Sequence, residues 1–211
     1  MNKKNIEEKI KIAKRGQNKN TPIDFNRLPS GQTLTEKFPV LDLGILPDVT
    51  FENWSLQIYG EVENERSFNF EDLKQLPFVV DVSDFHCVTH WSKFDVNWGG
   101  VRLSDLFNNV GIIDLNHYVT FHSYDGYTTN LPVKCLLDHD VLLAFQLDGK
   151  SLAKEHGGPA RIVVPKRYAW KSAKWIKAIE ILKDDCPGFW EVRGYHNDAD
   201  PWLEQRYVNE D

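Results

Sequence analysis

Hydrophobic and polar residues alternate in short runs along most of the chain, a pattern typical of β-strands. The runs that predict strands are Trp54–Tyr59, Phe78–Phe85, Tyr118–Ser123, Val141–Leu147, Arg161–Pro165 and Ile176–Leu182. Short helices are expected at Phe70–Leu76, Ser104–Asn108 and Val133–Leu137. These helices are too short for regular βαβ crossovers. The expected fold class is therefore α+β, with mixed or antiparallel sheets and short helices.

The two ends of the chain have different patterns. Ile6, Ile10 and Ala13 recur at helical spacing among charged residues, which predicts a short helix over residues 4–14. We expect an N-terminal helix and arm over residues 1–24 and a single domain over residues 25–211, a length that can bury its own core. The last part of that domain, residues 188–207, is too aromatic for a solvated tail and is expected to pack on it.

Composition narrows the possible partners and location. The chain has 25 basic and 31 acidic residues, a net charge of −6, which argues against nucleic-acid binding because that requires clustered positive charge. No run of 18 apolar residues occurs, so no transmembrane segment is expected. There are three cysteines and no recognisable export signal, which favours reduced thiols and a cytoplasmic location.

Cys87 is the most informative cysteine because it follows an apolar strand and is flanked by His86, His90 and Trp91. It could be a buried structural cysteine, which is the usual fate of a free thiol. It could bind zinc together with the histidines, although neighbouring side chains on a strand point to opposite faces and structural zinc normally has four ligands. It could also hold a soft transition metal whose other ligands come from a cofactor.

A second informative segment runs from Lys150 to Lys183 and contains nine basic but only two acidic residues. Such a run is often a solvated basic surface. Here Arg161 and Lys174 lie among apolar residues, two adjacent glycines permit close approach of the backbone, and Ser172 adds a hydroxyl donor. A phosphate-bearing cofactor would fit this segment.

Several motifs together resemble the sulfite oxidase family. Cys87–Ser92 and Trp98–Phe107 resemble the region of that family that carries the molybdenum-binding cysteine. His156–Arg161 and Lys171–Ile176 resemble its molybdopterin-binding segment, and Tyr124–Tyr127 and Leu142–Gly149 fill the interval in the same order. Within that family, the chain resembles the short prokaryotic members related to the periplasmic methionine sulfoxide reductase catalytic subunit. The resemblance implies the molybdopterin-binding fold of sulfite oxidase.

The resemblance also implies an activity and a set of site residues. The implied activity is two-electron oxygen-atom transfer by molybdenum–molybdopterin, on a small sulfoxide or an oxyanion-type substrate, with electrons exchanged with an unidentified partner. Cys87 would bind the metal. Cofactor contacts would come from Phe38, Val40, Ser123, Asp125, His156, Arg161, Ser172, Ala173 and Lys174. Catalytic and substrate contacts would come from Cys87, His90, Trp91, Lys93 and Arg167.

One departure bears on the substrate. Sulfite oxidases place an arginine five residues after the metal-binding cysteine, and this chain has Ser92 there. A dianion such as sulfite is best held by paired cationic donors, so sulfite is disfavoured. The alternative function is a non-catalytic module of the same fold that binds molybdopterin or zinc.

Overall fold

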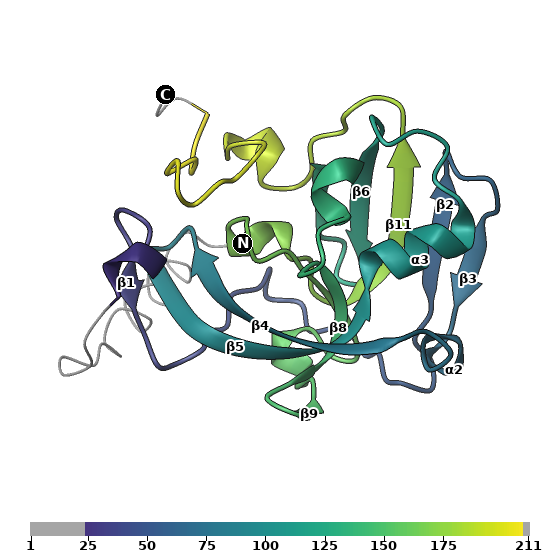
Figure 1. Ribbon diagram of the computed structural model, residues 1–211, viewed down its shortest axis with the longest axis horizontal. Coiled ribbons are helices and arrows are strands. Elements are labelled where there is room, and N and C mark those ends of the chain that lie inside the picture. Colours follow the sequence, from purple (N-terminus) through teal and green to yellow (C-terminus); the bar gives the residue numbers. More distant parts are fainter. Residues whose placement is uncertain (1–23, 209–211) are drawn as a thin grey trace.

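A computed structural model describes residues 24–208 and shows two mixed β-sheets joined by short helices (Figure 1). The α-helices are α2 (Phe70–Leu73) and α3 (Leu103–Val110), and the 3-10 helices are η1 (Phe25–Arg27), η2 (Val133–Leu136), η3 (Lys154–His156), η4 (Ala169–Lys171) and η5 (Glu191–Arg193). The strands are β1 (Thr33–Leu34), β2 (Leu56–Gly60), β3 (Arg66–Phe68), β4 (Phe78–Cys87), β5 (Trp91–Arg102), β6 (Tyr118–Ser123), β7 (Thr128–Pro132), β8 (Leu142–Leu147), β9 (Lys150–Ser151), β10 (Arg161–Val163) and β11 (Ile176–Leu182). The expected α+β class with mixed sheets is confirmed.

The first sheet is built around the long β4–β5 hairpin. Its strand order is β1-β5-β8-β10, with β4 paired to β5 and β9 paired to β8. Only β1 runs parallel to its neighbour. Strand β5 can lie close to β8 because Gly100 has no side chain, and a Cβ atom there would overlap the carbonyl of Leu143. At the other end of the hairpin, β1 pairs with the first residues of β5 (Figure 1).

The second sheet has five strands in the order β3-β2-β11-β6-β7. Strand β11 lies in its centre, parallel to β2 and antiparallel to β6. Helix α3 buries Leu103, Leu106, Phe107 and Val110 in the same hydrophobic core as this sheet. A second core cluster surrounds the β4–β5 hairpin and includes Phe85, Cys87, Trp91 and Trp98.

The structure corrects several element boundaries. The helix expected over Phe70–Leu76 ends at Leu73, and that expected at Val133–Leu137 is the 3-10 helix η2. The long strand Trp91–Arg102 was not predicted, because its buried residues lie on both faces and its pattern does not alternate. The helix expected over residues 4–14 lies outside the described residues.

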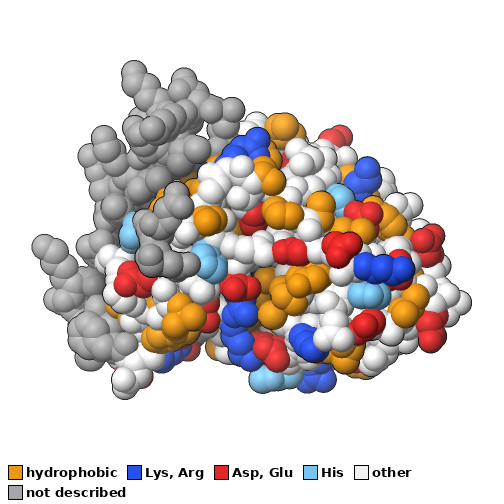
Figure 2. Space-filling model, turned by 90° about the horizontal axis from the view of Figure 1, so that it is seen from above, with side chains coloured by type: hydrophobic (Ala, Val, Ile, Leu, Met, Phe, Trp, Pro, Cys, Tyr) orange, Lys and Arg blue, Asp and Glu red, His pale blue; other side chains and the backbone are white. Residues whose placement is uncertain are grey.

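Side chains of both charge signs cover the visible surface (Figure 2). On the face shown in Figure 2, acidic and basic side chains are interspersed and form no continuous basic area. Within residues 24–208, no helix is both long enough and apolar enough to span a bilayer.

Candidate functional site

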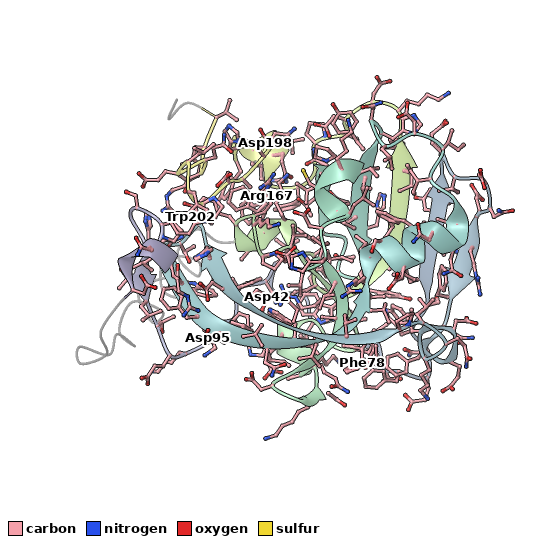
Figure 3. All side chains as sticks on the ribbon, viewed as in Figure 1. Asp42, Phe78, Asp95, Arg167, Asp198 and Trp202 are labelled. Carbon is pink, nitrogen blue, oxygen red and sulfur yellow. The ribbon has the colours of Figure 1, made fainter. Side chains whose placement is uncertain are left out.

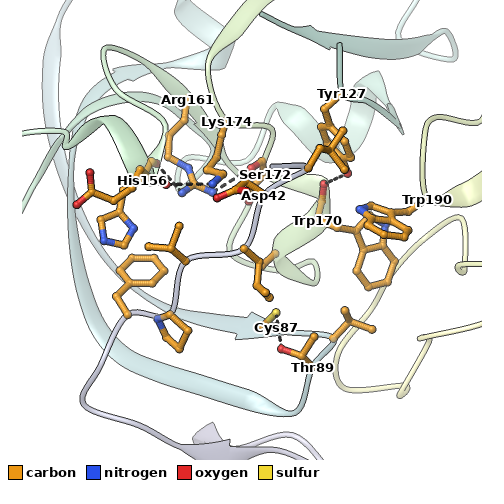
Figure 4. A pocket seen from close by; sticks show the side chains of 18 of the residues that line it. Asp42, Cys87, Thr89, Tyr127, His156, Arg161, Trp170, Ser172, Lys174 and Trp190 are labelled. Atoms are coloured by element: carbon orange, nitrogen blue, oxygen red, sulfur yellow. Dashed lines mark hydrogen bonds between the residues drawn. The ribbon is translucent and has the colours of Figure 1, made fainter. Parts of the chain in front are cut away.

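A cavity of about 210 Å³ lies where five parts of the chain meet. They are the end of the β4–β5 hairpin, the loop of residues 38–44, the β6–β7 turn with Asp125 and Tyr127, the segment of residues 155–175 and the C-terminal segment that follows β11 (Figure 4). The loop of residues 38–44 is called the pocket loop below. Residues from distant parts of the sequence therefore form one site.

Cys87 is the last residue of β4 and contributes its thiol to the cavity. It is 5% exposed, and its Sγ lies 3.2 Å from Thr89 Oγ1. Burial raises the pKa of Cys87, while the hydrogen bond with Thr89 and the positive charge of Arg206 act in the opposite direction. Because burial disfavours the Cys87 thiolate, a cation bound directly to the sulfur would stabilise it more than the hydrogen bond with Thr89 does.

The neighbouring histidine does not share this site. The Nδ1 atom of His86 lies 2.8 Å from Ser92 Oγ, and burial lowers the pKa of His86 to about 4. No group of three potential ligands among His, Cys, Asp and Glu gathers anywhere in residues 24–208. The zinc interpretation of Cys87 therefore has no structural support.

Arg161 provides a buried positive charge on the opposite side of the cavity from Cys87 (Figure 4). Its guanidinium donates hydrogen bonds to the carbonyl oxygens of His156 and Ser172, both at 2.9 Å, and to that of Ile162 at 3.3 Å. None of these acceptors carries a full negative charge. Burial lowers the pKa of Arg161 to about 9, so an anion bound beside it would be strongly stabilising.

Other polar groups complete this end of the cavity. Lys174 Nζ donates to the Glu155 carbonyl at 3.0 Å and lies 4.2 Å from the centre of the Trp175 ring. Burial and the charge of Arg161 lower the pKa of His156. Asp125 also lines the cavity, and burial raises its pKa. This end therefore combines cationic donors with a carboxyl group whose charge is disfavoured.

The pocket loop closes one side of the cavity. Phe38 packs edge-on against Trp91 and Trp98, with ring centres 5.8 Å apart in each case, and its ring centre lies 4.8 Å from that of His156. Val40 also lines the cavity. The carboxylate of Asp42 points toward Lys174 and Ser172 (Figure 4). The loop thus contacts both the hydrophobic wall and the cationic end.

Aromatic side chains form the wall nearest Cys87 on the C-terminal side. Trp170, Trp190 and Tyr195 all line the cavity and are called the aromatic wall below. The ring centre of Tyr195 lies 5.2 Å from that of Trp170 and 4.9 Å from that of Trp190. These three residues are not among those expected at the site, although the aromatic composition of the C-terminal segment is a signal for two of them.

Most of the residues expected at the site line this cavity. They are Phe38, Val40, Cys87, Trp91, Asp125, His156, Arg161, Ser172 and Lys174. Their assignment to the cofactor or to the substrate stays a prediction. The shared location agrees with the expectation that a basic segment and a distant cysteine serve one ligand.

Five expected site residues lie elsewhere. His90 is exposed on the hairpin turn, where its Nδ1 bonds to the Gly31 carbonyl at 2.8 Å. Lys93 donates to the Glu36 carbonyl at 2.9 Å. Ser123 and Ala173 are buried but do not line the cavity. Arg167 points to the C-terminal segment, 4.0 Å from Asp200 (Figure 3). None of these five residues lines the cavity, and the contacts expected for them stay predictions.

The cavity fits a molybdopterin group on the chemistry of its donors. A buried thiol offers a soft ligand for the metal at one end. A buried guanidinium whose hydrogen bonds go to carbonyl groups offers a site for the phosphate at the other. The hydrophobic and aromatic walls between them would exclude water.

Comparisons with known proteins agree with this fit. Residues 43–190 match the family model described as the oxidoreductase molybdopterin binding domain. The chain is 44% identical over 185 residues to an uncharacterized oxidoreductase of Bacillus subtilis, YuiH, covering 86% of this chain and 92% of that protein. It is 29% identical over 157 residues to the protein-methionine-sulfoxide reductase catalytic subunit MsrP of Campylobacter jejuni, covering 66% of this chain and 52% of that one.

Two further similar proteins are a sulfite oxidase and a sulfane dehydrogenase. Sulfite oxidase of Arabidopsis thaliana is 27% identical over 179 residues, which cover 68% of this chain and 46% of that protein. The crystal structure of the sulfane dehydrogenase SoxCD of Paracoccus pantotrophus matches with a TM-score of 0.60 and 26% identity, covering 66% of this chain and 40% of that one. The chain thus spans about half the length of the characterised relatives. It belongs to the sulfite oxidase-like family of molybdopterin-dependent oxidoreductases, has that family's fold, and uses a molybdenum–molybdopterin cofactor.

Proposed function

We propose that this enzyme reduces a small neutral sulfoxide by two-electron oxygen-atom transfer at molybdenum bound to Cys87. One observation carries the proposal: the buried Cys87 thiol and the carbonyl-held guanidinium of Arg161 line the same cavity. The electron partner and the cytoplasmic location expected from the sequence are parts of the same proposal.

The chain's residues would have distinct roles toward the cofactor. Cys87 would bind the metal as a thiolate, which a metal cation favours despite burial. Arg161, Lys174 and Ser172 would bind the phosphate end. Phe38 of the pocket loop would pack over the ring system and exclude water. The bound metal would supply the two-electron oxygen-atom chemistry, while the chain binds and orients.

The polarity of the cavity favours a neutral substrate over an oxyanion. The wall near Cys87 is aromatic and aliphatic, whereas Arg161 and Lys174 lie at the end assigned to the phosphate. Arg206 acts on Cys87 by its charge, but it does not line the cavity and its guanidinium donates to the Val88 carbonyl at 2.8 Å. Within residues 24–208, no pair of cations lines the Cys87 end. A dianion would therefore lack the paired donors that it requires.

The overall reaction balances with one reductant. A sulfoxide, two electrons and two protons give a thioether and one water molecule. The electrons would come in two steps from a one-electron carrier protein, and in the laboratory from a reduced viologen dye.

The decisive experiment compares two cysteine variants made in a host that synthesises the cofactor. Cys87→Ser removes the proposed ligand, whereas Cys135→Ser changes a partly exposed thiol outside the cavity and serves as the control. We expect about one molybdenum per chain and reduction of methyl phenyl sulfoxide in the wild type and the control. Cys87→Ser should lose bound metal and turnover.

Three outcomes would contradict the proposal. Full metal content and activity in Cys87→Ser would reject the ligand. Oxidation of sulfite without reduction of any sulfoxide would reject the substrate class. A protein that retains molybdopterin and shows no metal redox couple or turnover would support the non-catalytic alternative.

A further inference from the structure

A fully buried ion pair lies behind the aromatic wall and has no role in the function proposed above. Lys171 Nζ and Glu191 Oε1 are 2.7 Å apart, and their side chains are 0% and 2% exposed. Neither residue lines the cavity. Two charges removed from water in this way seldom add net stability, because their desolvation offsets their attraction.

The carboxylate of Glu191 is bonded directly to the wall. Its Oε1 accepts hydrogen bonds from Trp170 Nε1 and Thr129 Oγ1, both at 2.9 Å, as well as from Lys171. Lys171 Nζ also donates to the Asn130 carbonyl at 2.8 Å and is thereby anchored to β7. One oxygen therefore holds the N–H edge of the Trp170 indole in a single direction.

The rest of the Trp170 side chain and backbone is held as well. Its ring stacks on Tyr168 at 5.5 Å with an interplanar angle of 14°. Its carbonyl accepts a hydrogen bond from Tyr127 Oη at 2.5 Å. Rotation of the indole would break the bond to Glu191 and leave a buried donor without its partner, so Glu191 selects the orientation.

The same carboxylate links both halves of the wall. Glu191 begins η5 in the C-terminal segment and follows Trp190 directly, while Trp170 belongs to η4. The ring of Tyr195, from the same segment, packs edge-on against Trp170. The position of the C-terminal segment and the orientation of Trp170 thus depend on one buried contact.

We propose that the Lys171–Glu191 pair is a positioning device that sets the aromatic wall and thereby the affinity for the apolar part of the substrate. The inference rests on the proposed function, since it assigns the wall to the substituent of a sulfoxide. Glu191 and Lys171 act through Trp170 and do not touch the reacting atoms.

Two double variants separate the hydrogen bond from the charges. Glu191→Gln with Lys171→Met removes both charges and keeps an oxygen that can accept from Trp170 Nε1. Glu191→Leu with Lys171→Met removes the charges and the acceptor. Replacement of a buried pair by hydrophobic residues of similar volume is often neutral for stability, so both variants should fold. If the leucine variant does not fold, Trp170→Phe tests the same contact by removing the donor.

Two readouts other than turnover test the geometry. In protein labelled with ¹⁵N-tryptophan, the indole N–H of Trp170, identified by its absence in Trp170→Phe, should resist exchange with solvent in the wild type and the glutamine variant. It should exchange rapidly in the leucine variant. The Kd for methyl phenyl sulfoxide, measured on oxidised enzyme without an electron donor, should rise about fivefold in the leucine variant and stay unchanged in the glutamine variant.

Steady-state kinetics complete the test. The leucine variant should show the same rise in KM with kcat and molybdopterin content unchanged. An equal Kd in all three proteins, an unchanged Kd in Trp170→Phe, or equal losses in both double variants would overturn the inference. Sulfoxide that binds the wild type normally but is not reduced would instead refute the proposed function alone.

Discussion

Replacing Arg161 with methionine should weaken retention of the cofactor and leave the stability of the cofactor-free protein nearly unchanged. Lowering the pKa of this guanidinium from 12.5 to about 9 corresponds to about 5 kcal/mol against the charged form, at about 1.4 kcal/mol per pKa unit. Its three hydrogen bonds to carbonyl groups are charge-assisted and offset about 1.5 kcal/mol each, and its contacts with the rings of Phe85 and Trp98 offset part of the rest. Without an anion, Arg161 should therefore contribute little net stability, and its replacement should change the free energy of unfolding by less than about 1 kcal/mol.

Cofactor binding should give Arg161 a larger, favourable contribution. A phosphate beside Arg161 would convert the buried charge into a charge-assisted contact of about 1.5–3 kcal/mol. Loss of that contact should weaken cofactor retention by roughly tenfold to hundredfold. Arg161 would thus contribute mainly to affinity for the cofactor and little to the stability of the empty fold.

Two measurements check this prediction. Urea unfolding, followed by tryptophan fluorescence, is measured on protein made in a host that cannot synthesise molybdopterin. Pterin content per chain is measured after dialysis of protein from a competent host. Lys177→Met, an exposed cation on β11, is the matched control and should change neither quantity.

Two outcomes would contradict the role assigned to Arg161. If Arg161→Met destabilised the cofactor-free protein by more than about 2 kcal/mol, the main role of the guanidinium would be to stabilise the fold and not to bind an anion. If the variant retained pterin as well as the wild type does, Arg161 would not be the phosphate contact.

Two further predictions concern the scaffold of the site. Glu191→Gln alone should cost about 3–5 kcal/mol in urea unfolding, because it leaves the Lys171 charge buried without its partner. Adding Lys171→Met should restore most of that loss, and an unchanged midpoint in the single variant would contradict the pairing. Gly100→Ala should lower Tm and cost about 3 kcal/mol, since its Cβ would overlap the Leu143 carbonyl. An unchanged Tm would show that β5 and β8 can separate without loss.

Local hydrophobic patterns determined a large part of the fold. The strands at Tyr118–Ser123 and Ile176–Leu182 agree with the structure at both ends. Each is a short run rich in β-branched or aromatic residues, so the signal is local. Strand β5 was missed because Trp91–Arg102 has buried residues on both faces and contains two glycines, which weakens any period-two signal.

The sequence by itself determined the family and the candidate residues, because Cys87, Arg161 and Lys174 lie in short motifs that together resemble those of the sulfite oxidase family. Only the tertiary structure decided which neighbours share the cavity. His90 and Arg167 lie outside the cavity, whereas Trp170 lines it. The indole N–H of Trp170 donates a hydrogen bond to Glu191. Side-chain direction and long-range pairing depend on packing between distant segments, which no local pattern encodes.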